Sequence, residues 1–193
     1  MSNLLPYKDL RDSFFKKYFE LGLSYSDYAK SGNDAQNLRW SSGYNSVAPT
    51  ANQEKAVGSW TRRMNILVAS GIWCGDCSRQ GPMLKKISDA NKGISLSFVE
   101  SKAHPELMDE LRINGAEKVP VVVILSEDFF EISRFGDKHL SVYRRTANAL
   151  SGCEIGLPSQ EDLQTELQEW VDHIERAQIL LRLSPLLRKR YQD

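Results

Sequence analysis

The chain passes from a buried strand into a helix along Met64-Asn65-Ile66-Leu67-Val68-Ala69-Ser70-Gly71-Ile72-Trp73-Cys74-Gly75-Asp76-Cys77. Residues 64–70 are apolar and partly β-branched, which predicts an interior strand. Residues 78–91 carry apolar side chains at helical spacing and are followed by Gly93, which predicts a helix beginning close to Cys74. Two thiols three residues apart on a first helical turn can lie side by side and close a small disulfide ring.

The position of Cys74 favours its ionised form. The free backbone N–H groups and the positive end of the helix dipole lie at the start of a helix and stabilise a thiolate there. The thiolate is the nucleophile of thiol–disulfide exchange. Spacing and position together predict a Cys74–Cys77 redox couple.

Composition narrows the class of protein. The chain has 193 residues, 41% hydrophobic residues, and 25 basic against 25 acidic residues, so its charge gives no argument for nucleic acid or an anionic membrane. No apolar run approaches the roughly 20 residues that span a bilayer. The N-terminus lacks the pattern of a secretory signal, so we expect a cytoplasmic protein. Three cysteines do not form a disulfide framework, which favours a redox or metal role for the pair.

Residues 1–62 are predicted to be a helical extension packed on the domain that follows. An aromatic stripe at helical spacing predicts a helix over residues 8–21, and Thr50 with Gln53 predicts a capping box that opens a helix running to about Arg62. Shorter helical stretches are expected at 24–30 and 33–40. Residues 41–45, Ser-Ser-Gly-Tyr-Asn, are typical of a loop.

The rest of the chain alternates between strands and helices. Further strands are predicted at residues 94–100, 119–125 and 129–135, and further helices at 105–113, 139–150 and from the Ser159 cap to about Arg182. The first two strands are joined through a helix and should be parallel, and the last two should form an antiparallel hairpin. We therefore predict an α/β fold with a central four-stranded mixed sheet flanked by helices. It would occupy residues 63–184, with an insertion at about 137–158 and a solvated tail at 185–193.

These features resemble the thioredoxin superfamily. The Trp73-Cys74-Gly75-Asp76-Cys77 tract follows a buried strand, Pro82 lies where thioredoxins kink the active-site helix, and Val119-Pro120 is similar to their cis-proline loop. More narrowly, the Trp-Cys-Gly-Asp run is similar to that of bacterial thioredoxin-like proteins with a helical N-terminal extension. The resemblance covers roughly residues 64–182 and implies a thioredoxin-like fold.

The resemblance also implies roles for individual residues. Cys74 would attack a disulfide of a protein substrate, and Cys77 would resolve the mixed disulfide, with a thiol reductant system as the other partner. A cis Pro120 would place the Val119 backbone beside the thiols, where an extended substrate segment can bind. The supporting residues would be Trp73, Gly75, Asp76, Val119 and Pro120. No cofactor beyond the Cys74–Cys77 disulfide is expected.

Two positions depart from the thioredoxin pattern. Thioredoxins commonly carry a buried Asp six residues before the first cysteine, whereas this chain has Val68. The candidates for a substitute near the thiols are Asp76 and Glu100. Asp76 also stands where thioredoxin has Pro, and its charge opposes ionisation of Cys74. We therefore expect the pKa of Cys74 to lie below the free value of about 8.5 but not at the lowest known values.

Other functions remain open at this stage. The main alternative is a non-enzymatic interaction module that binds a peptide beside Trp73 and Pro120. A zinc site would need Cys153 and one of the three histidines as further ligands, an iron–sulfur cluster would need thiolates from a second subunit, and a peroxidase would need a peroxide-binding motif that is not visible. We therefore predict no metal ligands, no nucleic-acid partner and no membrane span, and the sequence carries no signal for the oligomeric state.

Overall fold

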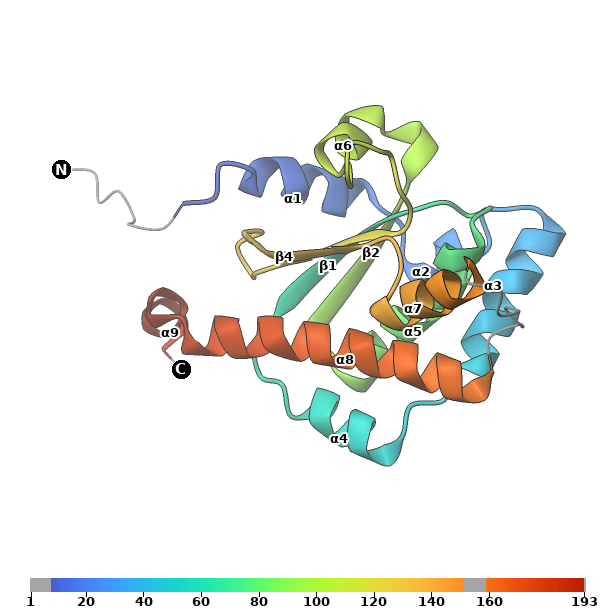
Figure 1. The fold of residues 1–193 in the computed structure, drawn as a ribbon. Helices are drawn as coiled ribbons and strands as arrows, with labels where there is room; N and C mark the ends of the chain where they lie inside the picture. Colours follow the sequence, from blue (N-terminus) through green and yellow to red (C-terminus); the bar gives the residue numbers. More distant parts are fainter. Residues whose placement is uncertain (1–7, 151–158, 193) are drawn as a thin grey trace.

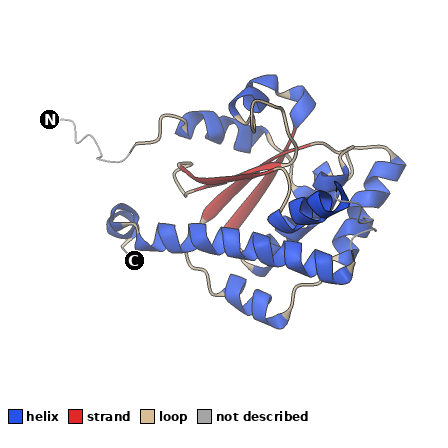
Figure 2. Ribbon diagram, in the orientation of Figure 1, coloured by secondary structure: helices blue, strands red, loops and turns tan. Residues whose placement is uncertain are grey.

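The computed structural model describes residues 8–150 and 159–192, and it contains one four-stranded sheet (Figures 1 and 2). Its strands are β1 (Met64–Ser70), β2 (Ile94–Glu100), β3 (Val121–Leu125) and β4 (Glu131–Gly136), in the spatial order β2-β1-β3-β4. β1 pairs with β2 in parallel and with β3 antiparallel, and β3 pairs with β4 antiparallel. The predicted α/β class, the mixed sheet, the parallel first pair and the antiparallel hairpin are confirmed.

Helices cover both faces of this sheet (Figure 2). They are α1 (Asp12–Leu21), α2 (Tyr25–Tyr28), α3 (Asp34–Ser46), α4 (Ala51–Gly58), α5 (Gly75–Ala90), α6 (Pro105–Glu110), α7 (Leu140–Leu150), α8 (Gln160–Leu183) and α9 (Pro185–Tyr191), with a short 3-10 turn at Ser101–Ala103. The described part of the chain has no helix that is both long and apolar enough to cross a bilayer.

The two faces of the sheet have separate cores because successive strand residues point to opposite sides. Leu67 and Ala69 face α1 and α6, where Phe15 and Tyr18 of the aromatic stripe are buried. The alternate residues of β1 face the larger core, which contains the buried faces of α5 and α8. In Figure 1, α1 and α6 lie above the sheet and α8 lies below it. The first turn of α5 therefore stands at the end of a strand that is buried on both faces.

Helix α3 is longer than the sequence predicts, because residues 41–45 continue the helix instead of forming a loop. Gly43 is needed there for packing: a Cβ at this position would lie 2.4 Å from the Ser78 backbone oxygen of α5. A second close approach lies nearby, since a Cβ at Gly81 would meet the Trp40 ring at 2.5 Å. The two glycines let α3 and α5 pack against each other at short range, and Trp40 is fully buried as a result.

The C-terminal segment, which the sequence predicted as a solvated tail, contains the helix α9, while its Arg188 and Lys189 are exposed as predicted. Pro185 is the first residue of α9, and Ser184 accepts a hydrogen bond from the Leu187 backbone N–H as its cap. Leu187 is buried in the larger core, and Arg190 pairs with Asp128 in the turn between β3 and β4. The sequence did not predict this helix, because the basic residues 188–190 are typical of an exposed segment and the contacts of Leu187 and Arg190 are made with distant residues.

Other boundaries differ by a few residues. α4 ends at Gly58, before the predicted Arg62, while the capping boxes at Thr50 and Ser159 are present as predicted. Helices α1–α4 pack on the sheet, on α5 and on α8, but the division into an extension, residues 63–184 and a tail stays a prediction. Part of the predicted insertion, including Cys153, lies outside the described residues.

Candidate active site

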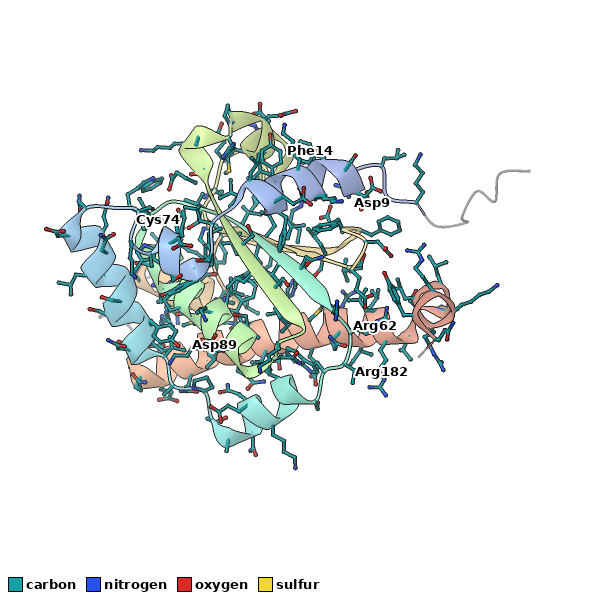
Figure 3. All side chains as sticks on the ribbon, turned by 180° about the vertical axis from the view of Figure 1, so that it is seen from behind. Asp9, Phe14, Arg62, Cys74, Asp89 and Arg182 are labelled. Carbon is teal, nitrogen blue, oxygen red and sulfur yellow. The ribbon has the colours of Figure 1, made fainter. Side chains whose placement is uncertain are left out.

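The two cysteines lie at the first turn of α5, on the side of the molecule that Figure 3 labels with Cys74, far from Arg62 at the other end of β1. Cys74 is the N-cap of the helix, and its sulfur accepts a hydrogen bond from the Cys77 backbone N–H at 3.4 Å. Both cysteines are free thiols. The sequence-predicted juxtaposition of the two sulfurs at a helix N-terminus is therefore present.

Cys74 is the more ionisable thiol. Its pKa is lowered to about 7, first by the hydrogen bond with the Cys77 side chain and then by the backbone N–H groups of Cys77 and Asp76, while burial and the Asp76 charge act in the opposite direction. The side chain is half-buried, so a reagent can reach it. The value lies between the free thiol and the lowest known thiolates, as the sequence predicts.

Cys77 has the opposite character. It is only 1% exposed, and burial raises its pKa well above that of a free thiol, with the hydrogen bond and the charge of Cys74 adding to the effect. The Gly71 backbone N–H donates to its sulfur at 3.4 Å. At neutral pH Cys77 is therefore a thiol, while a substantial fraction of Cys74 is ionised to the thiolate.

The Val119–Pro120 segment forms a wall beside Cys74. The peptide bond between these residues is cis, and the Cys74 thiol lies 3.7 Å from the Val119 carbonyl oxygen. Pro120 is buried and Val119 is half-buried. A Cβ on Gly136 of the neighbouring strand would meet the Pro120 carbonyl oxygen at 2.8 Å, so a residue without a side chain is required there. The structure thus brings Val119 to the thiols, as the sequence predicts.

Trp73 offers an exposed apolar surface next to Cys74. Its ring is 44% exposed, and the Lys102 ammonium lies 4.9 Å from the ring centroid. The ring lies over Gly71, where a Cβ would approach it to 2.7 Å. Gly75, the first residue of α5, is exposed and has open space around its Cα. An exposed aromatic ring of this kind is suited to apolar contacts.

The carboxylate of Asp76 forms two ion pairs. It accepts from Arg79 at 2.7 Å and lies 3.9 Å from the Lys138 ammonium. Arg79 also pairs at 2.8 Å with the fully buried Glu166, which in turn pairs with Arg145 of α7. This chain of charges ties the active-site helix to α7 and α8. The partners compensate the Asp76 charge and so weaken its effect on Cys74.

Sequence reasoning missed two hydroxyl groups near the buried thiol. Ser70 ends β1 and is fully buried, and Tyr28 of α2 is 1% exposed. The Tyr28 hydroxyl donates to the Glu100 carboxylate at 2.8 Å. Glu100 was one of two candidates that the sequence offered as a substitute for a buried Asp. The sequence did not predict a role for Tyr28, because no local pattern indicates that α2 packs next to the end of β1.

The described residues contain no group of three or more His, Cys, Asp or Glu side chains that could hold a metal ion. An apolar hollow of about 560 Å³ lies between α2 and α3 and is lined by residues that include Tyr25 and Tyr44. It does not include either cysteine.

Comparisons with known proteins place this fold in a family. The family model described as "Thioredoxin" matches residues 22–142, which is more than half of the chain and includes α2–α5 and all four strands. A Streptomyces coelicolor protein named "Putative thioredoxin 2" is 33% identical over 55 residues, which are 28% of this chain and 39% of that protein. The chain thus spans about two fifths of the length of that curated relative.

Solved structures share the fold. A protein of unknown function, PA1234 from Pseudomonas aeruginosa, superposes with a TM-score of 0.69 at 19% identity, covering 84% of this chain and 97% of that one. An HIV epitope-scaffold superposes with a TM-score of 0.65 at 19% identity, covering 83% of this chain and 97% of that one. Because the match extends over most of both chains, helices outside the sheet are shared as well.

Proposed function

The chain belongs to the thioredoxin family, and from that premise we propose that it is a thiol–disulfide oxidoreductase that exchanges dithiols and disulfides with protein substrates through Cys74 and Cys77. The observation that carries the proposal is the contrast between the two sulfurs. One is accessible, with a pKa of about 7, and the other is buried one turn away and protonated. An attacking thiol with a pKa near ambient pH is the most effective in exchange.

The reaction has two steps that balance atoms and electrons. The Cys74 thiolate attacks one sulfur of a substrate disulfide, a new S–S bond forms, and the other substrate sulfur leaves as a thiolate that takes up a proton. Cys77 then loses its proton and attacks the Cys74 sulfur, which forms the Cys74–Cys77 disulfide and releases the second substrate thiolate. Two electrons pass from the protein to the substrate, and a thiol reductant returns the protein to its dithiol form.

The surroundings of Cys74 favour a polypeptide substrate. Val119 lies next to the thiol with its backbone carbonyl turned to it, and an extended segment is able to hydrogen bond along this wall in the manner of an added strand. The exposed ring of Trp73, the residue before Cys74, offers an apolar contact. We further propose that the protein works in the cytoplasm, where thioredoxin-type systems keep thiols reduced.

Insulin reduction by dithiothreitol tests the proposal. The wild-type protein should accelerate precipitation of the insulin B chain, and Cys74→Ser should reduce the rate to that of dithiothreitol alone. Cys77→Ser should instead accumulate a covalent mixed disulfide that a non-reducing gel resolves and dithiothreitol removes. A wild-type protein without turnover and with an unreactive Cys74 would contradict the proposal.

The same experiment addresses the alternative of a peptide-binding module. Such a module would bind reduced and alkylated insulin B chain with equal affinity in wild-type and Cys74→Ser protein, and would not reduce the intact hormone. The half-exposed Trp73 is the observation that supports it. Indole fluorescence during titration with the alkylated chain therefore serves as its readout.

A further inference from the structure

Resolution of a mixed disulfide requires Cys77 to lose a proton while it is buried. Burial keeps that sulfur protonated, and the position six residues before Cys74 holds Val68, which accepts no proton. Val68 itself is 1% exposed and packs in the larger core. A proton acceptor must therefore come from another part of the fold.

Three polar side chains converge next to Cys77 from three elements. Ser70 and Glu100 are register partners at the ends of β1 and β2. Tyr28 reaches them from α2, and its hydroxyl donates to Glu100 Oε2 at 2.8 Å. Ser70 Oγ is buried and has no hydrogen-bond partner of ordinary geometry among the described residues, yet it lies close enough to both Cys77 and Tyr28 to lower the pKa of each.

The far end of this group is connected to solvent. Glu100 is half-buried, and its Oε2 also accepts from the Ile72 backbone N–H at 3.1 Å. It borders a surface hollow of about 450 Å³ that is also lined by Tyr28 and His104. Burial raises the pKa of Tyr28, so this hydroxyl stays protonated and is able to pass a proton on without storing a charge.

We propose that Ser70, Tyr28 and Glu100 carry the proton of Cys77 to solvent when that thiol attacks the mixed disulfide, an inference that rests on the function proposed above. Cys77 gives its proton to Ser70 Oγ, Ser70 gives its own to the Tyr28 oxygen, and Tyr28 gives its own to Glu100. Each hydroxyl gains one proton and loses one. The Cys77 sulfur keeps the electron pair that forms the bond to Cys74, and Glu100 releases the proton to water.

The order of the two steps suits this route. The Cys74 charge is one of the causes that raise the pKa of Cys77. That charge disappears once Cys74 is bonded to a substrate sulfur, because a disulfide sulfur is neutral. The Gly71 N–H at 3.4 Å then stabilises the emerging Cys77 thiolate. Proton transfer is therefore easier in the mixed disulfide than in the free dithiol.

The test separates the two chemical steps with 5,5′-dithiobis(2-nitrobenzoate). Attack by Cys74 releases one coloured thiolate in a phase whose rate depends on reagent concentration, and attack by Cys77 releases a second in a phase whose rate does not. All proteins carry Cys153→Ser, so that only Cys74 and Cys77 contribute to the colour change. The variants are Tyr28→Phe and Glu100→Gln, which keep the size of the side chain, with Glu100→Asp as the conservative substitution.

We expect Tyr28→Phe and Glu100→Gln to slow the second phase about a hundredfold at pH 7, at the low end of general acid–base effects, while the first phase changes less than about twofold. The loss should shrink at higher pH, where hydroxide removes the proton, and Glu100→Asp should restore part of the rate. The other titratable groups near this path are Cys74, Asp76 and His104, which all variants retain.

Tyr25→Phe is the matched control. Tyr25 lies on the same helix, is buried, and donates to the Trp40 carbonyl at 3.3 Å, away from the thiols. It should leave both phases unchanged. A wild-type second phase in Tyr28→Phe, or an equal slowing of both phases, overturns the proton route and leaves the proposed function standing, whereas absence of the first phase in the wild-type protein overturns the function itself.

Discussion

The two sides of the first turn of α5 carry the same functional group in opposite surroundings. On the outer side, Cys74 accepts hydrogen bonds from the start of the helix and is accessible. On the inner side, Cys77 is buried in the larger core, which also contains Trp40 and Tyr28. The difference shows that a three-residue spacing supplies two thiols, while the helix and the core make their pKa values and their accessibility unequal.

The inner side depends on elements that precede the strand–helix unit. α2 contributes Tyr28, α3 contributes Trp40, and the glycine contacts with α5 hold α3 in place. Tyr28 stacks on Phe98 of β2 with ring centroids 5.3 Å apart. The helices before β1 therefore take part in the environment of the buried thiol, and the four predictions that follow test this division between the two sides.

The largest expected effect is the difference in alkylation rate between the two cysteines. At pH 7 iodoacetamide should label Cys74 on the order of a hundredfold or more faster than Cys77, because each pKa unit changes the thiolate fraction about tenfold and Cys77 is also inaccessible. Peptide mapping of the labelled protein at successive times measures both rates. In guanidinium the rates should become similar, and unequal rates there would mean that the fold is not the cause.

The next largest effect should come from disturbing the packing around Cys77 with Gly81→Ala. The new methyl group would overlap the Trp40 ring, which a bare Cα approaches without conflict. We expect a loss of about 1–3 kcal/mol in the free energy of unfolding and faster labelling of Cys77. Denaturant titration and alkylation are the measurements. Gly58→Ala, at the end of α4, is the control, because its Cβ would have only an ordinary contact at 3.9 Å.

A smaller, roughly tenfold effect is expected from pH on the outer side. The alkylation rate of Cys74 should rise between pH 6 and pH 8 with a midpoint at about 7, because the reactive form is the deprotonated one and its fraction grows as pH passes the pKa. Iodoacetamide kinetics on the Cys77→Ser protein would also show how much of the lowering depends on the inner sulfur. Its midpoint should move upward, since the hydrogen bond from Cys77 is the largest cause. An unchanged midpoint would mean that the backbone N–H groups alone lower the pKa of Cys74.

The smallest effect should follow Asp76→Asn. The Asp76 charge raises the pKa of Cys74, so its removal lowers that pKa, but Arg79 and Lys138 already compensate the charge. We expect the alkylation rate at pH 6 to rise by no more than about threefold. A larger rise would show that the ion pairs do not form in solution, and raising the salt concentration in the wild-type protein is the matching test.

Local patterns predicted the sheet and the thiols well. β1 and β2 have the predicted bounds because continuous apolar runs between turn residues have few other interpretations. The placement of Cys74 at a helix start followed from local spacing, which depends on neighbours in sequence. The placement of Val119 beside it was implied by the resemblance to the thioredoxin superfamily, because the two residues are far apart in the sequence.

Features that depend on distant contacts were missed or wrong. Gly43 belongs to a helix because it meets the Ser78 backbone, a contact that no local pattern contains, so residues 41–45 were predicted as a loop. α9 was predicted as a solvated tail because its anchors, Leu187 and the Arg190–Asp128 pair, depend on the turn after β3. Tyr28 reaches the thiols for the same kind of reason. The positions of the two thiols could therefore be predicted from the sequence better than the positions of the groups around them.

The short pairing of Leu23 with Phe98 covers part of an edge of the sheet. The two residues exchange both backbone hydrogen bonds, at 2.8 and 2.9 Å, along the outer side of β2, which is an edge strand of the sheet. Unsatisfied edge groups are templates for joining another chain. Because the segment at Leu23 occupies part of this edge, a fragment beginning at β1 would expose more unpaired backbone groups of β2. We expect this fragment to aggregate more than the full chain, which light scattering of both proteins at equal concentration measures.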